Sequence, residues 1–89
     1  MKKLFSFYWE CGREGSVEGN FVADEADLNS AIGKKVVLGD VLGKYSWIEG
    51  NLELSDIFVV SVDQEKIQCF ESLFPNGTGY NPLDYIEQS

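Results

Sequence analysis

Residues 3–23, KLFSFYWECGREGSVEGNFVA, decide the fold of this chain. Apolar and polar side chains alternate on both sides of the GREG sequence at 12–15, and a period of two residues is typical of β-strands. The two glycines of GREG are a hairpin signal. The sequence therefore predicts two antiparallel strands, whose apolar faces carry Phe5, Phe7, Trp9, Cys11, Val17, Phe21 and Ala23.

Two later segments have the helical period instead. Residues 25–32 are predicted to form a short helix, with Asp24 as its N-cap and Gly33 at its left-handed end. Asp63 is predicted to cap a second helix with an apolar stripe, which stops before the turn-rich PNGTG sequence at 75–79.

Three further strands complete the pattern, at 35–42, 45–54 and 57–62, and the uninterrupted apolar run of the last predicts a central strand. The order ββαβββα predicts a single α+β domain over residues 1–89, with a mainly antiparallel five-stranded sheet and two helices packed on one face. We expect residues 75–89 to be an irregular tail docked on the body, because its aromatic and aliphatic side chains are too apolar to remain in water.

The chain is acidic and contains no histidine. It carries 15 acidic and 7 basic side chains, a net charge of −8 at pH 7, and in residues 45–89 Lys66 is the only base. Such a surface repels nucleic acid and anionic membranes and attracts basic partners. We therefore expect a protein partner with a basic surface, and neither direct nucleic-acid binding nor membrane binding. The alternative, that the charge only keeps a small protein soluble, stays open. Without histidine, histidine-based hydrolase triads are excluded.

The cysteines and the N-terminus predict the compartment. Cys11 and Cys69 lack the spacing of a metal site, and we expect two buried thiols in a reducing cytoplasm rather than a disulfide. Glu10 interrupts the first apolar run before it reaches the length of a signal peptide, and no run approaches the roughly 20 residues of a membrane span. The sequence predicts a protein of the bacterial cytoplasm.

Residues 33–46, GKKVVLGDVLGKYS, look like a phosphate-binding loop at first sight. Such a loop needs four residues between its glycines, then lysine and a hydroxyl residue, and it opens a helix. Here Gly39 and Gly43 enclose three residues, Tyr45 replaces the hydroxyl residue, and a strand pattern follows. The stretch is therefore predicted to contain a tight hairpin turn at 43–44.

No catalytic, cofactor or metal site is predicted. The acids at 24, 25 and 27 lack the spacing of a calcium loop and are better explained by helix capping. The remaining candidates are surface residues: Tyr45 and Trp47 share a predicted strand face with Glu49, and aromatic side chains among charges are common anchors of protein interfaces. Coverage of these aromatics by helices or by the tail is left open. The candidate partner-binding residues are Tyr45, Trp47, Glu49, Glu53, Asp56, Asp63, Glu65, Glu71, Tyr80 and Tyr85.

The run GSVEGNFVADEADLNSAIGKKVVLGDVLGKYS and the closing GYNPLDY resemble short acidic proteins of bacterial and phage genomes. The resemblance brings no activity and no site residues. Small acidic phage proteins as a class include inhibitors of host defence nucleases, of anti-CRISPR or DNA-mimic kind.

Our leading hypothesis is a non-enzymatic protein that inhibits a host defence or nucleic-acid-handling complex by occupying a basic partner. A second hypothesis is a small-ligand module that binds or sequesters a signalling nucleotide between subunits of an oligomer such as a dimer, with Arg13, Lys34, Lys35 and Lys44 meeting the phosphates. A third is a bacterial accessory protein with a dedicated partner.

Overall fold

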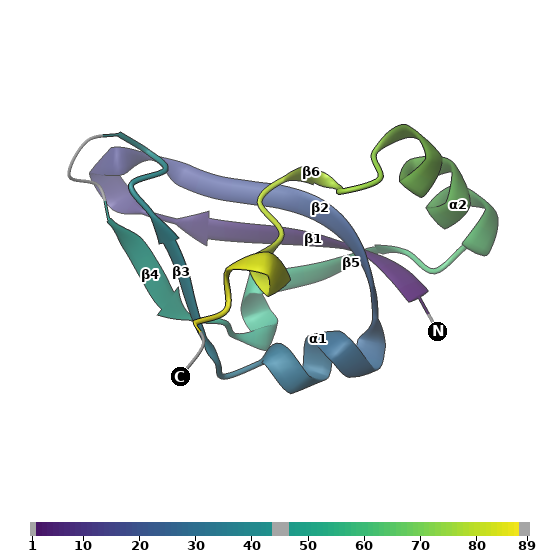
Figure 1. The fold of residues 1–89 in the computed structure, drawn as a ribbon, viewed down its shortest axis with the longest axis horizontal. Coiled ribbons are helices and arrows are strands. Elements are labelled where there is room, and N and C mark those ends of the chain that lie inside the picture. Colours follow the sequence, from purple (N-terminus) through teal and green to yellow (C-terminus); the bar gives the residue numbers. More distant parts are fainter. Residues whose placement is uncertain (1, 44–46, 88–89) are drawn as a thin grey trace.

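The computed structural model describes residues 2–43 and 47–87, and its longest strands, β1 (Lys2–Glu10) and β2 (Ser16–Asp24), are paired (Figure 1). They are antiparallel, with Lys2 opposite Asp24 at one end and Glu10 opposite Ser16 at the other. The turn between them is a short 3₁₀ helix, η1 (Gly12–Glu14), followed by Gly15 at a φ of 112°. Only glycine adopts such a φ without strain. The predicted hairpin is confirmed.

The strands form two sheets rather than one. β5 (Ile57–Ser61), β1, β2 and β6 (Thr78–Gly79) make a four-stranded antiparallel sheet in that order. β3 (Lys35–Gly39) and β4 (Ile48–Asn51) make a separate antiparallel pair near the end of β1 (Figure 1). The α+β class is confirmed, but the single five-stranded sheet is wrong.

The core explains why the sheet divides. One face of the β1–β2 pair is covered by α1 (Glu25–Ala31) and by the β3–β4 pair. Because β3 contributes the buried Val36 and Leu38 to this face and β4 the partly buried Ile48, the two strands pack onto the sheet and do not extend its hydrogen bonds. Phe5 and Phe21 lie opposite each other at the centre, with ring centroids 5.6 Å apart. The core consists of Phe5, Phe7, Val17, Phe21, Leu28, Ala31, Val36, Leu38, Leu52 and Ile57.

The two helices lie at different places on the sheet (Figure 1). α1 follows Asp24 as predicted, and Gly33 beyond it has a φ of 90°. α2 (Gln64–Leu73) begins at Asp63, whose side chain accepts a hydrogen bond from the Glu65 amide at 3.0 Å, so the predicted cap is confirmed. α2 lies at the start of β1, and its Ile67 is buried outside the core cluster.

β5 is the main correction to the predicted fold. The apolar run at 57–62 was expected to form a central strand, but β5 lies at the edge of the four-stranded sheet. Ile57 is buried, whereas Phe58, Val59, Val60 and Val62 are 59%, 54%, 55% and 55% exposed. Val59 pairs with Phe5 and Ser61 with Leu4, so Val60 is the extra residue of a β-bulge.

The β3–β4 connection is longer than predicted. Gly39 pairs with Ile48, so residues 40–47 connect the strands and a two-residue turn at 43–44 does not close the hairpin. Lys44 and Tyr45 lie outside the described residues.

The tail lies against β3. Pro82 in a short 3₁₀ helix, η3 (Pro82–Tyr85), is buried, and Ile86 forms a β-bridge with Val36. The Glu87 amide donates a hydrogen bond to the Lys35 carbonyl at 2.8 Å. Where the chain returns past β2, the Tyr80 amide donates to the Glu18 carbonyl at 3.1 Å. A Cβ atom on Gly19 would overlap the Tyr80 backbone, so this close approach requires glycine.

We predict that Gly19→Ala separates the tail from β2. The added methyl meets backbone atoms that cannot move aside, and overpacking of this kind costs about 1–3 kcal/mol. Gly50→Ala is the matched control, because its Cβ would lie 3.6 Å from the Trp9 ring, an ordinary contact. Chemical denaturation measures the stability of both variants, and limited proteolysis reports on the tail. Equal stability of the two variants, with equally protected tails, would contradict the close approach.

Candidate protein-binding surface

The described residues offer no metal centre and no membrane span. Within residues 2–43 and 47–87, no three side chains of His, Cys, Asp or Glu gather closely enough to hold a metal ion. In the same residues, no helix has the length and apolar character needed to cross a membrane.

The predicted partner-binding residues fall into separate groups. Trp47 and Glu49 lie on β4 or beside it, Glu53 precedes the 3₁₀ helix η2 (Leu54–Asp56) and Asp56 ends it, and three acids lie on or before α2. Tyr80 and Tyr85 belong to the tail, and Tyr45 lies outside the described residues. The structure therefore brings together Trp47 with Glu49, and Glu53 with Asp56, but not the whole set. The three acids of the α2 group are Asp63, Glu65 and Glu71.

Trp47 and Glu49 form an ordered, solvent-facing pair. Trp47 is 59% exposed, and its indole N–H donates a hydrogen bond to the Glu49 carboxylate. Lys35 Nζ lies 3.2 Å from Glu49 Oε2 and 3.8 Å from Glu87 Oε2. The Trp47 bond, and next the bond from Lys35, lower the pKa of Glu49 from its ordinary value. Glu49 in turn raises the pKa of Lys35.

Three of the predicted acids have structural roles. Asp56 Oδ2 accepts hydrogen bonds from Trp9 Nε1 at 2.8 Å and from the Glu53 amide at 3.0 Å, and Glu53 completes this capping box. Asp63 caps α2. Their carboxylates hold the two ends of the segment that contains β5, although each still contributes negative charge to the surface.

The other predicted residues differ in their exposure. Glu65 on α2 is exposed, whereas Glu71 is half-buried with an oxygen 3.5 Å from Lys2 Nζ. Tyr80 is half-buried against the core and packs edge-on against the exposed Tyr85, with ring centroids 6.2 Å apart. Docking of the tail therefore places Tyr80 among body residues rather than on an open surface.

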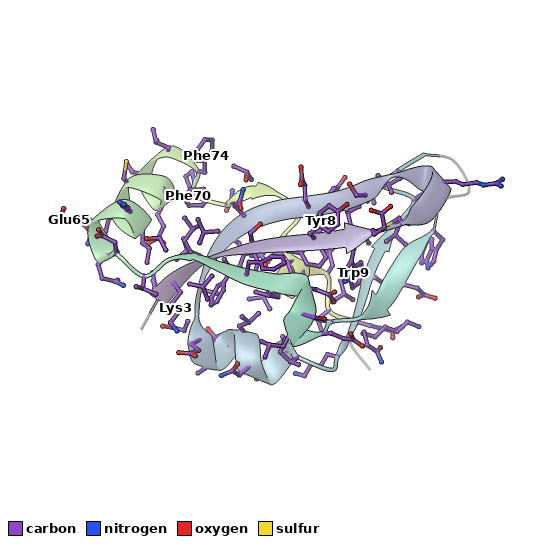
Figure 2. All side chains as sticks on the ribbon, turned by 180° about the vertical axis from the view of Figure 1, so that it is seen from behind. Lys3, Tyr8, Trp9, Glu65, Phe70 and Phe74 are labelled. Atoms are coloured by element: carbon purple, nitrogen blue, oxygen red, sulfur yellow. The ribbon has the colours of Figure 1, made fainter. Side chains whose placement is uncertain are left out.

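Sequence reasoning missed one exposed apolar feature of the described residues, the edge formed by residues 57–62. We call these residues the β5 edge. Figure 2 shows the side on which β5 runs along β1, with α2 and its Phe70 and Phe74 at one end. Leu73 at the end of α2 and Phe74 directly after it are also exposed. The uninterrupted apolar run was a visible signal, but it was interpreted as burial.

The cysteines also differ from their prediction. Cys69 on α2 is exposed, and Cys11 is half-buried next to η1. The expected burial of both thiols is wrong for Cys69, because α2 turns a different stripe, centred on Ile67, toward the sheet.

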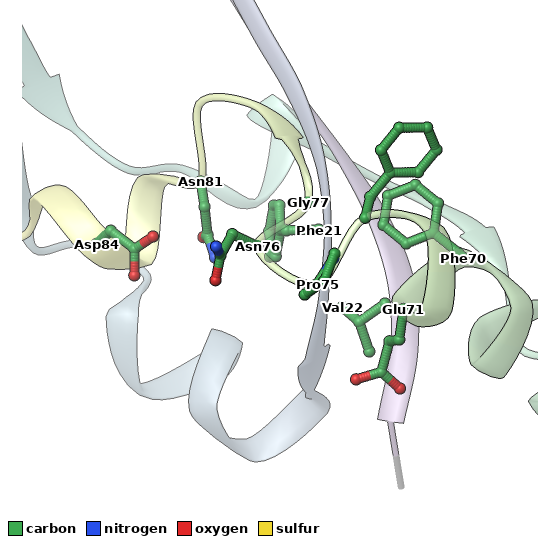
Figure 3. A pocket seen from close by; sticks show the side chains of 10 residues that line it. Phe21, Val22, Phe70, Glu71, Pro75, Asn76, Gly77, Asn81 and Asp84 are labelled. Atoms are coloured by element: carbon green, nitrogen blue, oxygen red, sulfur yellow. The ribbon is translucent and has the colours of Figure 1, made fainter.

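Three hollows in the described residues are lined by acidic side chains and not by basic ones. The first, of about 150 Å³, lies between α2 and the tail, with Glu71 on one side, Asp84 on the other and Asn76 and Asn81 between them (Figure 3). The second, of about 310 Å³, contains two indoles and two carboxylates, and the third, of about 320 Å³, contains Glu18. Among the described residues that line these hollows there are acids but neither lysine nor arginine.

This chemistry does not favour a nucleotide site. Arg13, Lys34 and Lys35, the described members of the predicted phosphate-binding set, line none of these three hollows. Lys35 is already paired with two carboxylates. A phosphate entering any of these hollows would instead meet like charge.

Comparison with protein-family models, curated proteins and solved structures finds no match to this chain.

We predict that Glu49 titrates below the ordinary range of a glutamate and that two changes raise its pKa. Trp47→Phe removes the indole donor and Lys35→Met removes the ammonium group, whereas Lys34→Met leaves both in place. Because the folded pKa is lowered, the pair stabilises the fold above the unfolded pKa of glutamate and loses this contribution as the pH falls through the folded pKa. Carboxyl-carbon NMR titration measures the values. An unchanged Glu49 pKa in both test variants would contradict the pair.

Proposed function

We propose that this chain is a non-enzymatic protein-binding protein that captures an extended segment of a basic partner along the β5 edge. The observation that carries the proposal is the open outer side of β5. Within residues 2–43 and 47–87, the strand is paired with β1 on one side only, and its Phe58, Val59 and Val60 remain exposed. Edges of this kind are templates for an added strand.

Backbone and side chains support this binding mode together. On the side away from β1, alternate N–H and C=O groups of an edge strand have no partner within the sheet. An added strand would satisfy them with main-chain hydrogen bonds, while Phe58 and its neighbours would supply pockets and apolar area. The main-chain hydrogen bonds would give affinity, and the side-chain contacts would fix the register of the added strand.

The charges at the ends of the β5 edge favour a basic partner. Asp56 precedes the strand and Asp63 follows it, and Glu65 is exposed one turn into α2. The segment between them, IFVVSV, carries no charge. A partner segment with apolar residues in its middle and lysine or arginine at its ends would match both features.

The same charges disfavour a second copy of this chain. In an antiparallel pair of two β5 strands, Asp56 of each copy would approach Asp63 of the other, and facing like charges destabilise strand pairs. The bulge at Val60 also interrupts the regular edge, a feature that limits self-pairing in natural sheets. The net charge of −8 adds repulsion between whole molecules.

This binding mode supports inhibition of a nucleic-acid-handling complex. A basic surface that holds phosphates would be attracted by the acidic chain, and an occupied surface would exclude nucleic acid. The acidic chain would speed association with such a partner at low salt.

We predict that Phe58→Lys weakens partner binding at least about tenfold, since a buried interface aromatic contributes about 2 kcal/mol or more. Leu54→Lys is the matched control, because it adds the same charge at a residue that is exposed in η2 rather than on β5. Affinity capture from a bacterial lysate identifies the partner, and titration of the purified partner at two salt concentrations measures its Kd.

Two results would overturn the proposal. One is a captured partner whose affinity falls equally in both variants or does not depend on salt. The other is a homodimer in sedimentation experiments that Phe58→Lys dissociates, since a second copy would then occupy the edge.

A further inference from the structure

A second binding feature lies away from the outer side of β5, in the hollow of about 310 Å³ between the end of β1 and β4. We call it the indole hollow. It contains both tryptophans of the chain and two glutamates. Its lining consists of Trp9, Glu10, Cys11, Trp47, Ile48 and Glu49.

Trp9 is held rigidly on its side of the hollow. Its Nε1 donates a hydrogen bond to Asp56 Oδ2 at 2.8 Å, and its ring meets Phe7 edge-on, with centroids 5.1 Å apart. The far edge of the ring lies over Gly50, close enough to contact a Cβ atom there at 3.6 Å. The position of this indole is therefore set by three different contacts.

Trp47 is oriented although it is exposed. Its indole N–H donates to Glu49, and its ring lies over Gly39, where a Cβ atom would be 3.7 Å away. Because Trp9 is placed before a ligand arrives, ordering of its side chain on binding costs little entropy.

The carboxylates of Glu10 and Glu49 differ in the charge of the groups that they contact. Glu49 is paired with Lys35, whereas Glu10 Oε2 accepts a hydrogen bond from the neutral Tyr8 hydroxyl at 2.8 Å. This bond raises the pKa of Tyr8, so the hydroxyl remains a donor and does not become a competing anion. The bond from Tyr8 therefore brings no positive charge to Glu10.

We infer that the indole hollow binds one cationic side chain, the guanidinium of an arginine presented by the partner. Indole faces attract cations, and a planar guanidinium stacks on them while donating paired hydrogen bonds to a carboxylate. Aromatic faces beside carboxylates make a poor site for a phosphate or a neutral group. The residues that line the indole hollow are different from those of the β5 edge.

The experiment uses the two indole N–H signals of the full chain in a ¹H–¹⁵N NMR spectrum. The probe is N-acetylarginine N′-methylamide at millimolar concentration, and its citrulline analogue is the neutral control of the same shape. We expect saturable shifts of both indole signals with arginine, and binding of citrulline at least about fivefold weaker.

Variants distinguish binding in the indole hollow from attraction of the probe to the net charge of the chain. Trp47→Ala removes one indole, so we expect saturable binding to be lost while the spectrum of the remaining chain is kept. Trp47→Phe retains an aromatic face and should recover part of the affinity. Glu10→Gln should weaken arginine binding about threefold or more, whereas Glu65→Gln, which changes the net charge equally on α2 outside the hollow, should not.

Three results would overturn the inference. They are the absence of saturable shifts with the arginine probe, equal affinities for arginine and citrulline, and unchanged arginine binding in a folded Trp47→Ala variant. An equal affinity for the lysine analogue would contradict the assignment to a guanidinium.

Discussion

The pairing of β1 with β2 is the constraint on which the rest of this structure depends. A slip of one residue in the register between Lys2–Glu10 and Ser16–Asp24 would turn Phe5, Phe7 and Phe21 out of the core. Because the register fixes which face is apolar, α1, the β3–β4 pair and the tail all cover the same face. The close approach of the tail at Gly19 depends on the same register, since Gly19 pairs with both Phe7 and Gly79.

The central position of β1 also explains where the two proposed binding features lie. β1 has β2 on one side and β5 on the other, so β5 becomes an outer strand whose far side is open. The far end of β1 carries Trp9 and Glu10 to β4, where Trp47 and Glu49 complete the indole hollow. Asp56 connects the two regions, because its carboxylate holds Trp9 and its backbone leads into β5. Apolar side chains therefore lie beside acidic side chains both at the β5 edge and in the indole hollow.

Local patterns in the sequence predicted the local structure well. Alternation identified the hairpin, and the capping residues located α1 and α2, because these signals act within a few residues. The shared face of Trp47 and Glu49 followed from alternation in the same way. The edge position of β5 could not be predicted, because an uninterrupted apolar run has the same pattern in a central strand and in an exposed edge strand. The strand with which β5 pairs is also distant in the sequence. The contribution of Trp9 to the hollow was missed because it depends on how β4 packs against β1.

Amide hydrogen exchange on the free, monomeric chain tests the open β5 edge most directly. β1 is bonded to strands on both sides, so we expect its amides to exchange slowly, near the rate set by global unfolding. In β5, the amides that point away from β1 should exchange much faster than their neighbours, in an alternating pattern. Protection of every β5 amide to the level of β1 would contradict an open edge and would place β5 inside a sheet.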